Sequence, residues 1–91
     1  MMSATLIVRH TVADFAAWQK VYTEAGSIRA KHGCTGERVL QSPSDPNDVL
    51  ATHEFPSVGQ AEAFAGDPEL RSAMQRGGLM GPPRVEIFQG A

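Results

Sequence analysis

The stretch TLIVRH, Thr5–His10, decides the fold of this chain, because it has the composition of a β-strand and leads directly into a helix start. The same succession recurs at Val49–Phe55, and the chain holds two further strand-like runs, at Glu37–Gln41 and at Arg84–Phe88. The resulting order, β-α-β-β-α-β, predicts an α+β fold in which one sheet carries both helices on the same face. We expect one domain that spans residues 1–91.

The first strand also indicates what covers the other face of the sheet. Every residue of Thr5–Val8 is β-branched or apolar, so both faces of this strand are expected to be buried. Helices cover only one face, and a domain of 91 residues buries only about 60–65% of the surface of its unfolded chain. We therefore predict that a second sheet covers the open face and that the protein is a homodimer.

An apolar stripe and two end signals predict the first helix. Thr11 and Asp14 have the spacing of a capping box, although Asp14 could itself be the N-cap. Gly26 is expected to weaken the middle of this helix, and His32-Gly33 to end it. The stripe comprises Phe15, Trp18, Val21, Tyr22, Ala25 and Ile28.

Similar signals divide the second half of the chain. Ser57 and Gln60 have the spacing of a second capping box, and Asp67-Pro68 predicts that the helix restarts there. Gly77-Gly78 is expected to end it. Between the second and third strands, Ser42–Asp48 is dense in turn-forming residues and predicts a hairpin loop longer than two residues.

Charge and composition argue against several classes of function. Eight basic and ten acidic residues give a net charge of −2 without a basic stripe, which disfavours nucleic acid or a membrane as a partner. Cys34 is the only cysteine, so neither an intrachain disulfide nor a cysteine cluster for metal can form, and we expect a cytoplasmic protein. Met1–His10 lacks the pattern of a signal peptide, and no apolar run approaches the roughly 20 residues that span a bilayer.

Five short stretches carry a resemblance to a known family. They are Thr11–Trp18, Asp45–Asn47, Glu54–Pro56, Ala61–Phe64 and Asp67–Arg71, and the likeness extends over nearly the whole chain. In these stretches the chain resembles the dimeric α/β-barrel superfamily, and within it small proteins known as antibiotic-biosynthesis monooxygenase-like or cyclase-like.

This resemblance implies a ferredoxin-like half, in which a four-stranded antiparallel sheet pairs through its open face into one barrel per dimer. It further implies that a small apolar or aromatic molecule binds between the sheet and its helices. Members of the superfamily include oxygenases that use neither metal nor flavin. We therefore expect no cofactor and no metal.

His10 and His53 are the candidate catalytic residues. His10 ends the first strand beside a helix start, where it could act as a general base or simply hydrogen-bond the loop. Alternation places His53 on one face with Val49, Ala51 and Phe55, but leaves open whether that face meets the helices or the dimer partner. Because the first and third strands should be antiparallel neighbours, we expect the two histidines not to meet and to form no metal site.

Four further residues are candidates for substrate binding. Trp18 and Tyr22 lie one turn apart on the first helix, so they either line a pocket for a planar aromatic ligand or pack in the core. Phe64 belongs to the apolar side of the second helix. Arg9 would hold an anionic group if it faced the cavity, whereas on the other face it would form a cross-strand ion pair near the rim.

Two classes of function remain open. The first is an enzyme, either a cofactor-free monooxygenase-like enzyme for a small aromatic or polyketide-like substrate, or an acid–base isomerase or cyclase. The second is a non-catalytic dimer that binds a metabolite or a partner protein. A cavity with His10 or His53 directed into it favours an enzyme. A cavity filled by aromatic side chains, Phe88 among them, with both histidines exposed at the rim, would argue against one.

Overall fold

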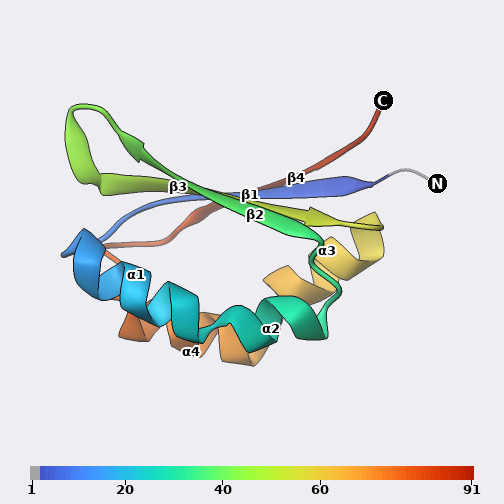
Figure 1. The fold of residues 1–91 in the computed structure, drawn as a ribbon, viewed down its shortest axis with the longest axis horizontal. Coiled ribbons are helices and arrows are strands. Elements are labelled where there is room, and N and C mark those ends of the chain that lie inside the picture. Colours follow the sequence, from blue (N-terminus) through green and yellow to red (C-terminus); the bar gives the residue numbers. More distant parts are fainter. Residues whose placement is uncertain (1–2) are drawn as a thin grey trace.

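The computed structural model describes residues 3–91 and places its helices on one face of a four-stranded sheet (Figure 1). Met1 and Met2, which begin the segment expected to contain no signal peptide, lie outside the described residues. The elements are β1 (Ala4–Thr11), α1 (Phe15–Glu24), α2 (Gly26–Lys31), β2 (Gly36–Ser42), β3 (Asp45–Phe55), α3 (Val58–Ala65), α4 (Pro68–Arg76) and β4 (Arg84–Gln89). The predicted α+β, ferredoxin-like architecture is confirmed.

The strands lie in the order β2-β3-β1-β4, and every neighbouring pair is antiparallel. Strand β1 is central, since it pairs with β3 along Ala4–Thr11 and with β4 along Ala4–Arg9. This confirms that the first and third strands are antiparallel neighbours. Within residues 3–91, no helix is long and apolar enough to cross a membrane.

The first helix begins after Asp14 and is interrupted at Ala25, immediately before Gly26. The carboxylate of Asp14 accepts a hydrogen bond from the backbone N–H of Ala17 at 2.9 Å, so of the two alternatives Asp14 is itself the N-cap. Helix α1 stops before Ala25 and α2 begins at Gly26, so the predicted weak point is a break between two helices. Helix α2 ends just before Gly33, whose φ of 79° lies in the left-handed region that favours glycine.

The other two helices start at the predicted caps. The hydroxyl of Ser57 accepts from the backbone N–H of Gln60 at 3.2 Å and donates to its side-chain oxygen at 2.9 Å. At α4, the carboxylate of Asp67 accepts from the N–H of Glu69 at 2.9 Å, and Pro68 occupies the first turn. These contacts are local in sequence, which is why the residue types alone predict them.

The turn between β2 and β3 differs from the prediction. Only Pro43-Ser44 connects the two strands, because β3 already begins at Asp45, so the expectation of a loop longer than two residues is wrong. The additional residues are accommodated as an irregularity in the ladder, where the register shifts between Gln41 and Ser42.

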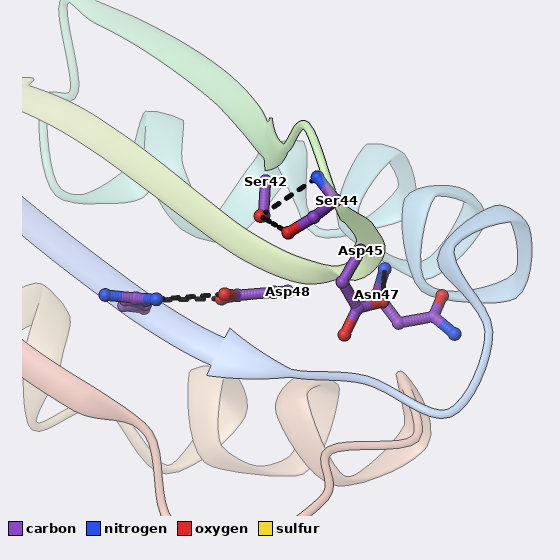
Figure 2. A network of polar contacts seen from close by, with 6 residues as sticks. Ser42, Ser44, Asp45, Asn47 and Asp48 are labelled. Atoms are coloured by element: carbon purple, nitrogen blue, oxygen red, sulfur yellow. Dashed lines mark hydrogen bonds and ion pairs between the residues drawn. The ribbon is translucent and has the colours of Figure 1, made fainter.

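Side-chain hydrogen bonds hold this turn in place (Figure 2). The hydroxyl groups of Ser42 and Ser44 lie 3.2 Å apart, and the carboxylate of Asp45 accepts from the N–H of Asn47 at 3.0 Å. The side-chain oxygen of Asn47 in turn accepts from the N–H of Phe15 at 2.9 Å. The turn is thereby joined to the first residue of α1.

Alternation along the strands separates a covered face from an open one. Leu6 and Val8 are buried beneath the helices, where Phe55 and Phe64 complete the largest cluster of the core. The intervening residues of β1 point to the other face, which no helix covers (Figure 1). Apolar side chains on that open face are Ile7, Leu40, Leu50 and Phe88; Leu40 is 37% exposed and Phe88 is 54% exposed.

Candidate functional site

A cavity lies between the covered face of the sheet and the helices. Strands β1 and β3 form one wall. The other walls come from all four helices and from Ala25, which lies between α1 and α2. Its lining residues are Val8, His10, Trp18, Val21, Tyr22, Ala25, Arg29, Ala51, His53, Phe64, Leu70, Ala73 and Met74. Both candidate histidines and three of the four candidate binding residues therefore line one cavity.

The cavity is narrow. The volume that the centre of a water molecule can occupy in it is about 40 Å³. The whole empty space between its walls, part of which is open to solvent, is about 480 Å³. By the first measure a single water requires roughly 10–15 Å³, so the cavity admits a few waters. A larger ligand requires lining side chains to move.

Leu70 and Met74 are the side chains best placed to move. They also line a wider groove between α4 and the edge strand β4. The volume that the centre of a water molecule can occupy in this groove is about 480 Å³, against about 40 Å³ in the cavity. Methionine has three rotatable side-chain bonds and fills irregular spaces at little cost. These two side chains, with Val8, line both spaces and lie between the cavity and the groove.

His10 lines the cavity without a hydrogen-bond partner. Its side chain is 7% exposed, and neither Nδ1 nor Nε2 bonds to any described group, so the predicted alternative of a bond to the loop is not observed. The ring contacts the edge of Trp18 at a centroid distance of 5.4 Å. Burial lowers the pKa of His10, so the imidazole is neutral at pH 7 and able to accept a proton.

His53 lies on the helix side of the sheet, which settles the alternative that alternation left open. It is 3% exposed, and its Nε2 lies 3.1 Å from the hydroxyl oxygen of Tyr22. Burial, and then the charge of Arg29, lowers the pKa of His53 to about 4. Burial likewise raises the pKa of Tyr22 to about 12, so both partners of this hydrogen bond are neutral at pH 7.

Arg29 contacts the Tyr22 ring and pairs with Glu37, and neither charged residue was among the predicted site residues. The Arg29 guanidinium carbon lies 4.0 Å from the centroid of the Tyr22 ring, and its Nη1 donates to the Tyr22 backbone carbonyl at 2.9 Å. Its Nε pairs with Glu37 at 2.7 Å. Arg29 follows Tyr22 by seven residues, two helical turns, so helical spacing could have indicated that the two share a face.

Trp18 serves the pocket wall and the core at once. Its ring stacks on Tyr22 at 4.9 Å and lies 5.7 Å from Phe15, between centroids. The end of α4 approaches it closely at Gly77, where a Cβ atom would lie 3.0 Å from the indole ring. Trp18 therefore lines the cavity and packs in the core at the same time, while its contact with a planar aromatic ligand stays a prediction.

His10 and His53 face the same cavity from separate places. His10 is opposite Val49 and His53 is opposite Leu6 in the β1–β3 ladder. The two are thus on neighbouring strands and four positions apart along one face, about 13 Å in the strand direction, and do not meet, as expected. Among residues 3–91, no three His, Cys, Asp or Glu side chains gather in a way that could hold a metal ion.

Arg9 lies outside the cavity. Strand alternation places it on the open face, where it pairs with Asp48 at 2.9 Å (Figure 2), the second of the two alternatives predicted for it. Phe64, by contrast, lines the cavity 5.3 Å from His53 between ring centroids. Phe88 is on the open face and does not fill the cavity.

Solved structures confirm the fold that the resemblance in the sequence implied. Over 100% of this chain and 99% of the other, the structure matches a Bordetella bronchiseptica protein described provisionally as an antibiotic biosynthesis monooxygenase, with a TM-score of 0.83 and 15% identity. It also matches SnoaB, a cofactor-independent oxygenase from Streptomyces nogalater, with a TM-score of 0.75 and 14% identity over 100% and 93% of the two chains. A similarly described Caulobacter crescentus protein gives a TM-score of 0.75 and 17% identity over 99% and 90%.

At these identities the likeness concerns the fold. No protein-family model and no curated protein matches the sequence.

Proposed function

We propose that the protein binds a small aromatic molecule in the cavity and removes a proton from it with His10, as the first step of a cofactor-independent oxygenation. The observation that carries this proposal is the imidazole of His10 in the wall of the cavity. His10 is 7% exposed, and neither ring nitrogen has a hydrogen-bond partner among the described groups. Buried polar groups are normally paired, because an unpaired one costs roughly 1–3 kcal/mol. A ligand that bonds to His10 would remove this cost.

The chemistry requires only the ligand, molecular oxygen and a base. His10 would take a proton from an acidic C–H or O–H group and leave an electron-rich carbanion or phenolate. This anion passes one electron to O2, and the two radicals combine into a peroxide that recovers the proton and loses water. An activated CH2 group and one O2 thereby become a C=O group and one H2O, so no external reductant is consumed.

The surroundings of His10 suit a neutral, largely apolar ligand. Apart from the two histidines, Tyr22 and Arg29, every residue that lines the cavity is apolar. The Arg29 charge is already paired with Glu37. The similar fold of SnoaB, a cofactor-independent oxygenase, supports the same class of chemistry here.

Oxygen uptake with a panel of anthrones, naphthols and hydroquinones tests the proposal. We expect His10→Leu to lower turnover at least about 100-fold, the usual contribution of a general base, while circular dichroism shows an intact fold. His32→Asn is the matched control, because His32 pairs with Asp67 outside the cavity and should leave turnover unchanged. Full oxygen uptake by His10→Leu would refute His10 as the base.

The same panel separates the other functions. Conversion of a compound without uptake of oxygen would identify an acid–base isomerase or cyclase. Binding without any conversion, in the wild type and the variants alike, would identify a non-catalytic metabolite-binding protein.

The proposal also concerns assembly and location. It takes the chain as one domain that pairs through its open face with a second copy, supported by the uncovered side chains of Leu40 and Phe88. The unpaired thiol of Cys34 is compatible with the reducing cytoplasm.

A further inference from the structure

One proton lies in the hydrogen bond between Tyr22 and His53. Whether Tyr22 or His53 carries this proton decides whether the Tyr22 hydroxyl donates to a ligand or accepts from it. The distance from Tyr22 Oη to His53 Nε2 is 3.1 Å, and both side chains line the cavity. A neutral imidazole carries one N–H. Either Nε2 donates to the phenol, which leaves the hydroxyl hydrogen for a ligand, or the phenol donates to Nε2, which leaves only oxygen lone pairs.

The relative acidity of the two groups places the proton on the phenol. A phenol, with an ordinary pKa near 10, is a stronger acid than a neutral imidazole, and an imidazole nitrogen is a far stronger base than a phenol oxygen. The O–H···N arrangement is therefore favoured. Because Nε2 then accepts, the ring proton of His53 is assigned to Nδ1.

The Tyr22 ring is also fixed in place. It lies between contacts to Trp18, at 4.9 Å between ring centroids, and to the Arg29 guanidinium, at 4.0 Å. Arg29 is only 7% exposed and is itself held by Glu37. The phenol oxygen therefore keeps one orientation relative to the cavity.

We infer that Tyr22, with its proton committed to His53, is a hydrogen-bond acceptor that selects ligands carrying a hydroxyl or N–H donor, in the first place phenols and enols. This inference rests on the proposed function, since it takes the cavity as the ligand site, and it adds the substrate class. His53 is then a positioning residue for Tyr22. A ligand would donate its hydroxyl to Tyr22 at one end of the cavity and lose its acidic proton to His10 at the other.

Three small aromatic ligands that share a tolyl group test the selectivity. The probes are p-cresol, which has a hydroxyl donor, and toluene and 4-methylanisole, which have none. Binding is followed by NMR at the indole N–H of Trp18, the single tryptophan and a cavity residue. We expect wild type to bind p-cresol about three- to tenfold more tightly than toluene, the effect of one net hydrogen bond. Tyr22→Phe should abolish this preference and leave the affinity for toluene unchanged.

The outcomes distinguish this inference from the proposed function. If all three probes bind wild type equally, or if Tyr22→Phe still prefers p-cresol, the inference is wrong while the cavity remains a ligand site. If none of the probes shifts the Trp18 signal, the proposed ligand site itself is contradicted.

Nitrogen NMR of the free protein tests the proton position without any ligand. We expect a His53 ring with a protonated Nδ1 and an unprotonated Nε2, and we expect the Nε2 resonance to change in Tyr22→Phe. A proton on Nε2 would overturn the inference whatever the probes do.

Discussion

At the scale of single residues, His10 carries a cost that a purely structural histidine would not. Because neither ring nitrogen has a partner among the described groups, we expect His10→Leu to raise the free energy of unfolding by about 1 kcal/mol. Urea denaturation of the two proteins measures the difference. A destabilised variant would show that His10 serves the fold and would weaken its assignment as a base.

His53 makes stability depend on pH. Its pKa is about 4 in the folded protein and near 6.5 in the unfolded chain, so between these values the unfolded chain binds the additional proton. Stability is therefore complete above pH 6.5 and falls as the pH drops toward 4, by about 3 kcal/mol in total.

Urea denaturation at pH 7 and at pH 4.5 measures this loss. His53→Gln, which keeps an acceptor for Tyr22, should remove most of it. An equal loss in the variant would assign the effect to another group, such as His10, whose pKa burial also lowers. Asp67 is not such a group, because its hydrogen bond with His32 lowers its pKa further below this pH range.

The sequence indicated most of the side chains that line the cavity, but not which face of each strand meets the helices. His10, His53, Trp18, Tyr22 and Phe64 follow from element ends, alternation and helical spacing. Which face of a strand meets the helices depends on packing between elements distant in sequence, so alternation alone could not place His53 or exclude Arg9 from the cavity.

At the scale of elements, helix α3 depends on its cap. We expect Ser57→Ala to cost about 1 kcal/mol and to lower the melting temperature by about 4–8 °C, because it removes the acceptor for the N–H of Gln60. Ser72→Ala is the matched control, since Ser72 is exposed within α4 and should tolerate alanine. Thermal unfolding followed by circular dichroism compares the two, and equal melting temperatures would contradict the role of the cap.

The helix starts, which depend on residues close in sequence, were predictable. The length of the turn between β2 and β3, which depends on pairing between strands, was not. The caps at Asp14, Ser57 and Asp67 each need only residues two or three positions away. The short turn at Pro43-Ser44 arises because β3 begins early and pairs Asp45 with Ser42 of β2 across an irregular ladder, which the density of turn-forming residues cannot reveal.

At the scale of the whole molecule, the open face predicts the assembly. Phe88 is 54% exposed on that face, so we expect Phe88→Glu to convert a dimer of about twice 9.8 kDa into a monomer. Met80→Glu is the control, because Met80 is 61% exposed but lies in the loop before β4, not on the sheet. Sedimentation at micromolar concentration distinguishes the two, and a monomeric wild type would refute the dimer.

The edge contact between Trp18 and His10 has an optical consequence. An imidazolium ion accepts an electron from an excited indole and quenches its emission, whereas neutral imidazole does so weakly. Because the chain holds one tryptophan, and its ring centroid lies 5.4 Å from that of His10, we expect the tryptophan emission to fall as His10 takes up a proton. The protonation of the proposed base can thus be followed by tryptophan fluorescence, without a substrate.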